Sequence, residues 1–113
     1  LVQAGRCWSI KVTADLTAKG FKQSHADPCV FRKIVDGEVI TVIIIYVDEL
    51  LIRTKGPKMM DELLADLGSD HKLEDLGNAR YHLRCHITRD REKRRLKIEQ
   101  HLYARSMAER FGI

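Results

Sequence analysis

The sequence contains few cysteine, proline and aromatic residues, and it has no long apolar run. Three Cys, two Pro and one Trp stand among 113 residues, and aromatic side chains make up 6%. Cys7, Cys29 and Cys85 cannot all pair within one chain, so a disulfide framework is not predicted. We expect reduced thiols, with one bridge and one free thiol as the alternative. The longest apolar run, residues 42–47, is far shorter than the ~20 residues that cross a bilayer, so we expect no membrane partner.

The sequence also shows no targeting segment and no glycine-rich phosphate loop. No basic stretch followed by an apolar one opens it, so no signal peptide is expected. We therefore expect an intracellular protein, cytoplasmic or nuclear, with a secreted effector as the alternative if an upstream signal was removed. Because the sequence opens at Leu1 and not at Met, we expect a fragment, a processed product or a trimmed chain.

The composition is typical of a folded domain with a surplus of basic residues. Hydrophobic residues make up 44% and charged residues 32%, which excludes wholesale disorder. A chain of 113 residues can bury one modest core, so we expect residues 1–113 to form a single domain. Lys and Arg number 20 against 16 Asp and Glu, which gives a net charge of +4 and a pI near 9.1.

Three stretches have the spacing of helices. Residues 4–19 carry an imperfect apolar stripe, and Gly20 follows as a helix-ending glycine, with Phe21 placed to fold back on the last turn. A second helix is predicted at 57–67, with Pro in its first turn. The last helix, 100–111, is predicted to turn four apolar side chains inward: Leu102, Tyr103, Met107 and Phe111.

The remaining regular stretches have the character of strands. Residues 29–35 precede Asp36-Gly37, a pair typical of two-residue hairpin turns. Residues 39–46 are rich in β-branched side chains and apolar on both pleat faces, which predicts a strand buried on both sides. Further strands are expected at 50–54, 71–73, 80–89 and 95–99. Together with the helices they predict an α+β fold, an antiparallel sheet with helices packed on one face.

Two adjacent carboxylates, Asp48 and Glu49, stand at the tip of the apolar hairpin in the segment YVDE. Adjacent acidic side chains repel each other, and a turn needs neither. A divalent cation such as Mg²⁺ prefers oxygen ligands and would neutralise both. Two such ions about 4 Å apart stabilise the attacking and leaving oxygens in phosphoryl transfer. Asp48 and Glu49 are therefore candidate metal ligands, and the alternative is a solvated turn, where Asp is common.

Basic residues gather near the end of the chain. Residues 80–97 contain eight Lys or Arg and two acidic residues, a net charge of +6, so the rest of the chain carries −2. Such a hairpin suits a polyphosphate partner, because each neutralised phosphate releases a counterion. The alternative is a solvated hairpin whose charges prevent aggregation. The candidate nucleic-acid-binding residues are Arg84, Arg89, Arg91, Lys93, Arg94, Arg95 and Lys97.

His82, Cys85 and His86 are close in sequence, but the pattern does not predict a zinc site. On one continuous strand, His82 and His86 would share a face while Cys85 would point to the other, and no second ligand pair follows at zinc spacing. A nucleophilic cysteine is not predicted either, because each Cys stands in an apolar context typical of a core.

Six segments in order along the chain carry a resemblance to a known family. The opening LVQAGRCW resembles LKQAPRAW, and GF followed by ADPCVF resembles GF followed by ADPCLF. The segment YVDELLI resembles YVDDLLI, LEDLG resembles MKDLG, and RYHL resembles KYFLG. At the end, QHLY and RFGI resemble QRKYI and RFGM. These are the motifs of the reverse transcriptase of copia-type long-terminal-repeat retrotransposons, an RNA-directed DNA polymerase.

The resemblance implies the second half of a polymerase palm. Asp48 would be a ligand of both catalytic Mg²⁺ (or Mn²⁺) ions, Glu49 stands where the family has a second Asp, and Tyr46 would lie beneath the incoming nucleotide. The basic hairpin, residues 80–99, would correspond to the region that grips the primer, and the C-terminal helix would follow it. The implied partner is an RNA or DNA template–primer.

Departures from the family pattern bear on activity. Glu49 carries one more methylene than Asp, which pushes its carboxylate outward, and metal-positioning sites tolerate such shifts poorly. The family's other essential Asp lies on an earlier strand that this chain does not contain, and Arg84 and Gly5 replace a Gly and a Pro. We therefore expect a degenerate active site and no polymerisation by this chain alone. The alternative is a domesticated remnant that binds protein or nucleic acid, for example an effector acting on a host protein.

Without that earlier strand, an apolar strand at 40–46 or its neighbour is predicted to present an open edge. Open strand edges recruit another chain. We therefore expect the edge to be covered by self-association into a homodimer or by a strand from a protein partner.

Overall fold

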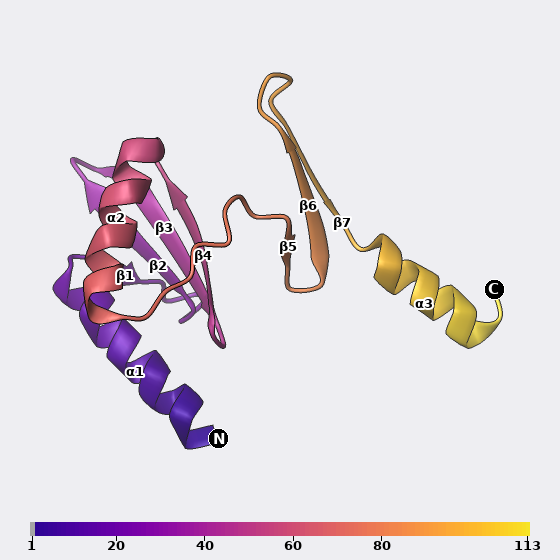
Figure 1. The fold of residues 1–113 in the computed structure, drawn as a ribbon, viewed down its shortest axis with the longest axis horizontal. Helices are drawn as coiled ribbons and strands as arrows, with labels where there is room; N and C mark the ends of the chain where they lie inside the picture. Colours follow the sequence, from indigo (N-terminus) through magenta and orange to yellow (C-terminus); the bar gives the residue numbers. More distant parts are fainter. Residues whose placement is uncertain (1) are drawn as a thin grey trace. The chain divides into compact units, whose positions relative to one another are not determined.

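The computed structural model describes residues 2–113, with side chains from residue 5 onward. The chain divides into two compact units, and the boundary in the sequence lies between Leu73 and Glu74. The first unit contains α1 (Val2–Ala18), β1 (Lys22–Gln23), β2 (Val30–Val35), β3 (Glu38–Tyr46), β4 (Glu49–Thr54) and α2 (Pro57–Asp70). The second contains β5 (Tyr81–His82), β6 (Cys85–Asp90), β7 (Arg95–Glu99) and α3 (His101–Phe111), as Figure 1 shows. Antiparallel sheets and helices confirm the predicted α+β class. The expectation of a single domain stays a prediction.

The first unit is built on a four-stranded antiparallel sheet in the order β1-β2-β3-β4. Asp36 and Gly37 connect β2 to β3, with φ values of 52° and 76°. Positive φ at both central residues is the type I′ arrangement that matches the twist of paired strands, so the predicted two-residue turn is confirmed. The register shifts between Lys33 and Ile34, where Ile40 of β3 has no opposite residue, so β3 has a bulge near this turn.

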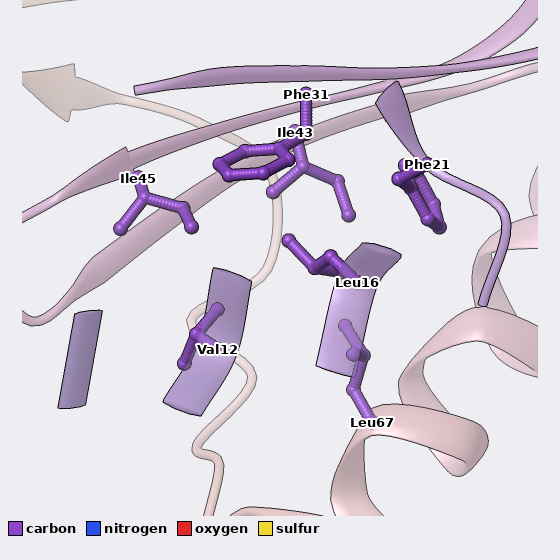
Figure 2. Packing of buried hydrophobic residues seen from close by; sticks show 7 residues of the cluster. All are labelled: Val12, Leu16, Phe21, Phe31, Ile43, Ile45 and Leu67. Atoms are coloured by element: carbon purple, nitrogen blue, oxygen red, sulfur yellow. The ribbon is translucent and has the colours of Figure 1, made fainter. Parts of the chain in front are cut away.

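The core of the first unit lies between the sheet and two helices on one of its faces. Seven side chains form it, from α1, the segment after it, β2, β3 and α2: Val12, Leu16, Phe21, Phe31, Ile43, Ile45 and Leu67. Figure 2 shows the sheet residues facing those of both helices. Trp8 of α1 is partly buried and packs against this cluster.

The prediction that β3 is buried on both faces is wrong. Thr41, Ile43 and Ile45 are buried, whereas Val42 and Ile44, which point to the opposite face, are only half-buried. Both helices of the first unit lie on the same face of the sheet, and within this unit, as described, no helix covers the other face. Apolar residues on both faces of a strand are typical of a strand that is covered on both sides. In this unit, α1 and α2 cover only one side.

The end of α1 has the predicted geometry. Gly20 has φ 92°, and its N–H donates to the Thr17 carbonyl oxygen over 3.1 Å. The N–H of Phe21 donates to the Leu16 carbonyl oxygen over 3.0 Å. These two bonds are the Schellman motif, and the accompanying contact places Phe21 with Leu16 in the core.

The region after α2 differs from the prediction, since residues 71–73 form no strand. The helix starts at Pro57 as expected but continues to Asp70, and the His71 N–H donates to the Leu67 carbonyl oxygen over 2.9 Å. The His71 ring Nε2 lies 3.0 Å from the Asp15 carboxylate. A long-range contact to α1 therefore decides the conformation of this segment, and local sequence carries no sign of it.

Polar side chains also join the carboxyl ends of α1 and α2. The Lys19 ammonium lies 3.2 Å from Asp15, 3.3 Å from Asp66 and 3.0 Å from Asp70. Hydrogen bonding to Asp70 outweighs partial burial and raises the pKa of Lys19. Partial burial raises the pKa of Asp15, but hydrogen bonds and charges from His71 and Lys19 outweigh it, so that pKa is lowered from 3.8.

The second unit is a three-stranded sheet in the order β5-β6-β7, followed by α3. The predicted strand at 80–89 is interrupted, because Leu83 and Arg84 have φ values of 50° and 63° and form a two-residue turn between β5 and β6. Arg84 stands where the family has Gly, the residue that adopts positive φ without strain.

The prediction that the last helix turns its apolar side chains inward is wrong. Leu102, Tyr103 and Phe111 are exposed by 52%, 49% and 62%, and Met107 is half-buried. The second unit contains no buried residue among its own described side chains, since one short sheet and one helix do not enclose a core. None of the helices described between residues 2 and 113 is long and apolar enough to cross a membrane.

Replacing Leu16 by Ala is expected to remove about 2–5 kcal/mol from the unfolding free energy of the first unit, because the side chain fills a closed core. Leu16 is 1% exposed, whereas Ile10 on the same helix is 59% exposed. Ile10→Ala is the matched control and is expected to change stability by less than about 0.5 kcal/mol. Urea unfolding followed by fluorescence of Trp8, the one Trp, measures both. Equal losses in the two variants would contradict the described core.

Replacing Asp15 by Asn is expected to flatten the acid limb of the stability curve. A carboxyl group whose pKa is lower in the folded state stabilises the fold above its unfolded pKa, near 3.8, and this contribution disappears as pH falls through the folded value. The contribution is no more than about 1 kcal/mol after solvent screening. Urea unfolding at a series of pH values measures it. Asp61→Asn, at an exposed carboxylate on α2, is the control and should leave the curve unchanged.

Candidate functional site

The YVDE segment forms the tip of the β3–β4 hairpin. Tyr46 pairs with Glu49 as the last residues of the two strands, and Val47 and Asp48 form the two-residue turn between them. All four side chains are exposed, Tyr46 by 51% and Val47 by 71%. The strongly apolar strands therefore project the two carboxylates from the end of the sheet into solvent.

Val47 adopts a backbone conformation that a β-branched residue rarely takes, with φ 54°. Positive φ at the first central residue alone is the pattern of a type II′ turn, which favours Gly at that position. A bulky residue held there costs about 1–3 kcal/mol. Strained residues of this kind cluster at active sites, so Val47 is a second indication that the hairpin tip is functional.

Asp48 and Glu49 offer oxygen donors of the kind that Mg²⁺ prefers. Among the residues that the structure describes, no three His, Cys, Asp or Glu side chains gather into a group that could hold a metal ion. Mg²⁺ is commonly held by one or two carboxylates, with water and substrate phosphates as its other ligands. The hairpin tip could therefore supply two of the ligands of a magnesium site, and it does not form a complete site by itself.

The predicted nucleic-acid-binding residues lie on one hairpin, but they do not share one face. All seven are exposed. Arg95 and Lys97 pair with Asp90 and Thr88 on one face of the sheet, and Arg89 lies on the other, opposite Leu96. Arg91, Lys93 and Arg94 occupy the turn between β6 and β7, and Arg84 lies in the turn before β6. The densest positive charge is therefore at the β6–β7 turn.

One of these charges is paired within the hairpin. The Lys97 ammonium lies 2.7 Å from the Glu99 carboxylate, and the His101 ring lies 2.7 Å from the other oxygen of the same carboxylate. Hydrogen bonding to Lys97 outweighs partial burial and lowers the pKa of Glu99. No ion pair is described for the other six candidate residues, whose charges remain available to a polyanion.

The formal charge is divided unevenly between the two units. Residues 1–73 contain ten basic and ten acidic side chains, for a net charge of zero. Residues 74–113 contain ten basic and six acidic side chains, which gives the whole +4 of the chain. The second unit is therefore a basic module, as the sequence predicted for residues 80–97.

The expected arrangement of His82, Cys85 and His86 is wrong. The turn at Leu83 and Arg84 makes His82 pair with Cys85, so these two share a face, while His86 pairs with Tyr81. The Cys7 and Cys29 thiols are exposed and Cys85 is half-buried, so the prediction of core cysteines is also wrong. All three thiols are free, as expected.

Sequence reasoning missed a basic row on the open face of the first sheet, the face turned away from α1 and α2. Arg32 and Arg53 flank Val42 across β2, β3 and β4, and Lys22 lies beyond Arg32 on β1. Residues that pair across two strands share a face, and so do alternate residues along one strand. Tyr46 on β3 and its partner Glu49 on β4 therefore lie on the same face as Val42 and Arg53. The period-2 pattern indicates which residues of each strand share a face, but only the observed pairing places the basic residues of neighbouring strands side by side.

A model of the family "Reverse transcriptase (RNA-dependent DNA polymerase)" matches residues 1–113. The chain belongs to this family. It is 31% identical over its full 113 residues to the retrovirus-related Pol polyprotein from transposon TNT 1-94 of Nicotiana tabacum. The chain spans about 8% of the length of that relative. The predicted copia-type resemblance is confirmed, and the chain is a reverse transcriptase fragment of that type. No solved structure matches it.

Replacing Val47 by Gly is expected to raise the unfolding free energy of the first unit by about 1 kcal/mol, because glycine adopts the observed φ without strain. Urea unfolding followed by Trp8 fluorescence measures the change. Val42→Gly, at a strand position with ordinary φ, should lower stability and serves as the control. A loss of stability in the Val47 variant would show that the turn is not strained.

Proposed function

We propose that this chain is the part of a copia-type RNA-directed DNA polymerase that supplies one share of the metal site and part of the surface for the nucleic acid. The observation that carries this proposal is the exposed Asp48-Glu49 pair at the tip of an apolar hairpin, in a chain that matches the family from end to end. Asp48 would be the principal ligand and Glu49 a displaced one, with Tyr46 beside them as the residue nearest an incoming nucleotide.

In this reaction class, bound Mg²⁺ or Mn²⁺ stabilises the attacking and leaving oxygens during phosphoryl transfer. The hairpin would hold the carboxylate of Asp48 at a fixed point on the end of the sheet, because the paired strands on both sides of the turn restrict its movement. Glu49 opens β4, and its longer side chain places the second carboxylate farther from the backbone than Asp would.

Two features support the nucleic-acid part of the proposal. The basic β6–β7 turn gathers Arg91, Lys93 and Arg94 around one acidic residue, Glu92. The open face of the first sheet carries Arg32 and Arg53 on the same side as the carboxylate tip. Both are suited to phosphate contacts, which position a duplex without reading its sequence.

We further propose that the 113-residue chain does not polymerise DNA by itself. Two neighbouring carboxylates are fewer ligands than two metal ions require, and Glu49 places one of them off the family's position. Primer extension with Mg²⁺ or Mn²⁺ is expected to give no product. Extension that disappears in Asp48→Asn would contradict this.

A second candidate function is a protein-binding module retained from the retroelement. The observation that favours it is the exposure of apolar side chains on β7 and α3: Leu96, Ile98, Leu102 and Phe111 are exposed by 61%, 62%, 52% and 62%. Exposed apolar surface of this kind marks interaction sites.

Metal binding is tested by amide NMR during titration with Mg²⁺. Saturable shifts are expected at Asp48 and Glu49 and are expected to be lost in Asp48→Asn, because the principal oxygen donor is removed. Asp36→Asn is the matched control, since Asp36 is an exposed Asp in the other two-residue turn of the same sheet. Silence at the hairpin tip, or equal loss in both variants, would contradict the metal site and favour the protein-binding candidate.

Nucleic-acid binding is tested with a primer–template duplex at several salt concentrations. The variant R91A/K93A/R94A is expected to bind more weakly and to reduce the salt slope by up to about 0.9 for each lost phosphate contact. The control R6A/K11A/K58A removes the same charge from exposed positions of the neutral first unit. Equal effects of the two variants would show that binding depends on net charge and not on the β6–β7 turn.

A further inference from the structure

The loop between β1 and β2, residues 24–29, lies at the same end of the first sheet as the carboxylate tip, residues 46–49. β1 runs antiparallel to β2, with Gln23 opposite Phe31, and β2 runs antiparallel to β3, with Val30 opposite Ile44. The loop therefore enters β2 at the end of the sheet where β3 leaves for the turn that carries Asp48. Since β2 and β3 are neighbours, the two loops lie next to each other.

Asp27 closes a turn in this loop with its side chain and with its backbone. Its Oδ1 accepts from the Cys29 N–H over 2.9 Å, and its carbonyl oxygen accepts from the Val30 N–H over 3.1 Å. Asp followed by Pro is the order that such turns favour, because a short carboxylate reaches the backbone two residues on and Pro presets φ. The Gln23 side-chain amide ties the turn to β1 by donating to the Pro28 carbonyl oxygen over 2.7 Å.

This turn extends the pairing of β2 with β3 toward the carboxylate tip. The Cys29 carbonyl oxygen accepts from the Ile45 N–H over 2.9 Å, and Ile45 is the residue before Tyr46. Because β2 itself starts at Val30, the bond belongs to the loop and depends on the conformation in which Asp27 holds it. The loop therefore supports the end of β3 directly before the tip.

The conformation of Val47 makes this support consequential. Its φ of 54° is unfavourable for a β-branched residue, and such conformations persist where the surrounding structure holds them in place. The pairing with β4 holds the tip on one side of β3, and the bond from Ile45 to Cys29 holds the end of β3 on the other side.

We propose that Asp27 is a positioning residue for the carboxylate tip. Its side chain fixes the Cys29 peptide group, the Cys29 carbonyl oxygen fixes the end of β3, and that end fixes the backbone from which Asp48 projects. Asp27 acts through these backbone groups and is not itself a metal ligand. Its effect on metal binding rests on the proposed function, whereas its effect on the end of β3 does not.

Amide hydrogen exchange of the full 113-residue chain, without metal, tests the support of β3. Asp27→Ala removes the Oδ1 acceptor, so the Ile45 amide is expected to exchange about fivefold faster, as for the loss of one ordinary hydrogen bond. The Ile44 amide, which faces β4, is the internal control and is expected to keep its exchange rate. An Ile45 amide that exchanges at the wild-type rate in Asp27→Ala would overturn the proposal.

Two further variants separate the hydrogen bond from the charge of Asp27. Asp27→Asn removes the same negative charge as Asp27→Ala but keeps an oxygen acceptor, so the Ile45 amide is expected to exchange as in the wild type. Cys29→Ala is the matched control in the same turn, because only backbone groups of Cys29 make the two bonds. It is expected to have no effect. Equal acceleration in the Asn and Ala variants of Asp27 would assign the effect to charge and overturn the proposal.

Titration with Mg²⁺, followed by the amide shifts of Asp48 and Glu49, tests the consequence for the site. Asp27→Ala is expected to weaken binding by about twofold to fivefold, because the tip holds its observed conformation for a smaller fraction of the time. Asp27→Asn is expected to restore the wild-type affinity. Faster exchange at Ile45 with unchanged Mg²⁺ affinity in Asp27→Ala would overturn the positioning role.

Failure of the proposed function gives a different result. A wild type without Mg²⁺ shifts at the tip would contradict the metal site, while the exchange rates at Ile45 in the three variants would still decide whether Asp27 holds the end of β3. Trp8 fluorescence shows that each variant is folded, so that a global defect is not taken for a local one.

Discussion

The first unit depends on burying one face of β3 against two helices. Ile43 and Ile45 project into the same core as Leu16 of α1 and Leu67 of α2, and this contact fixes which residues of every strand in the sheet face inward. Side chains alternate along a strand, so the opposite set must face the other way. That set contains Arg32, Arg53, Tyr46 and Glu49. The core thus decides the composition of the open face, and the open face carries the candidate chemistry.

The connection between α1 and α2 holds this arrangement at its other end. Lys19 lies among three carboxylates, and His71 reaches Asp15 across a long sequence separation. Neither helix could move along the sheet without breaking these contacts. The hairpin tip therefore projects from a sheet that is held on its helical face, while Val47 retains a conformation that an isolated hairpin would not favour.

The second unit differs because it has a surface but no core of its own. Its strands are joined by backbone hydrogen bonds, and its turns carry most of its net positive charge. Its apolar side chains on β7 and α3 remain exposed. Such a unit can present basic residues to a polyanion with little cost, since no buried group constrains them. Its exposed apolar residues are surfaces of the kind that mark interaction sites.

Much of this protein was determined by its sequence alone. Local patterns gave the Asp36-Gly37 turn, the glycine end of α1, the start of α2 and the basic hairpin, because each depends on neighbours within a few residues. The α+β class and the family came from the order of such patterns along the chain. Tertiary structure decided the rest. Burial of β3 on one face depends on where the helices pack, the conformation of His71 depends on Asp15, and the turn at Leu83 and Arg84 runs against the preference of both residues for negative φ. The alignment of Arg32, Arg53 and the carboxylate tip on one face required strand pairing, since period-2 alternation fixes the faces of one strand but not its register with the next.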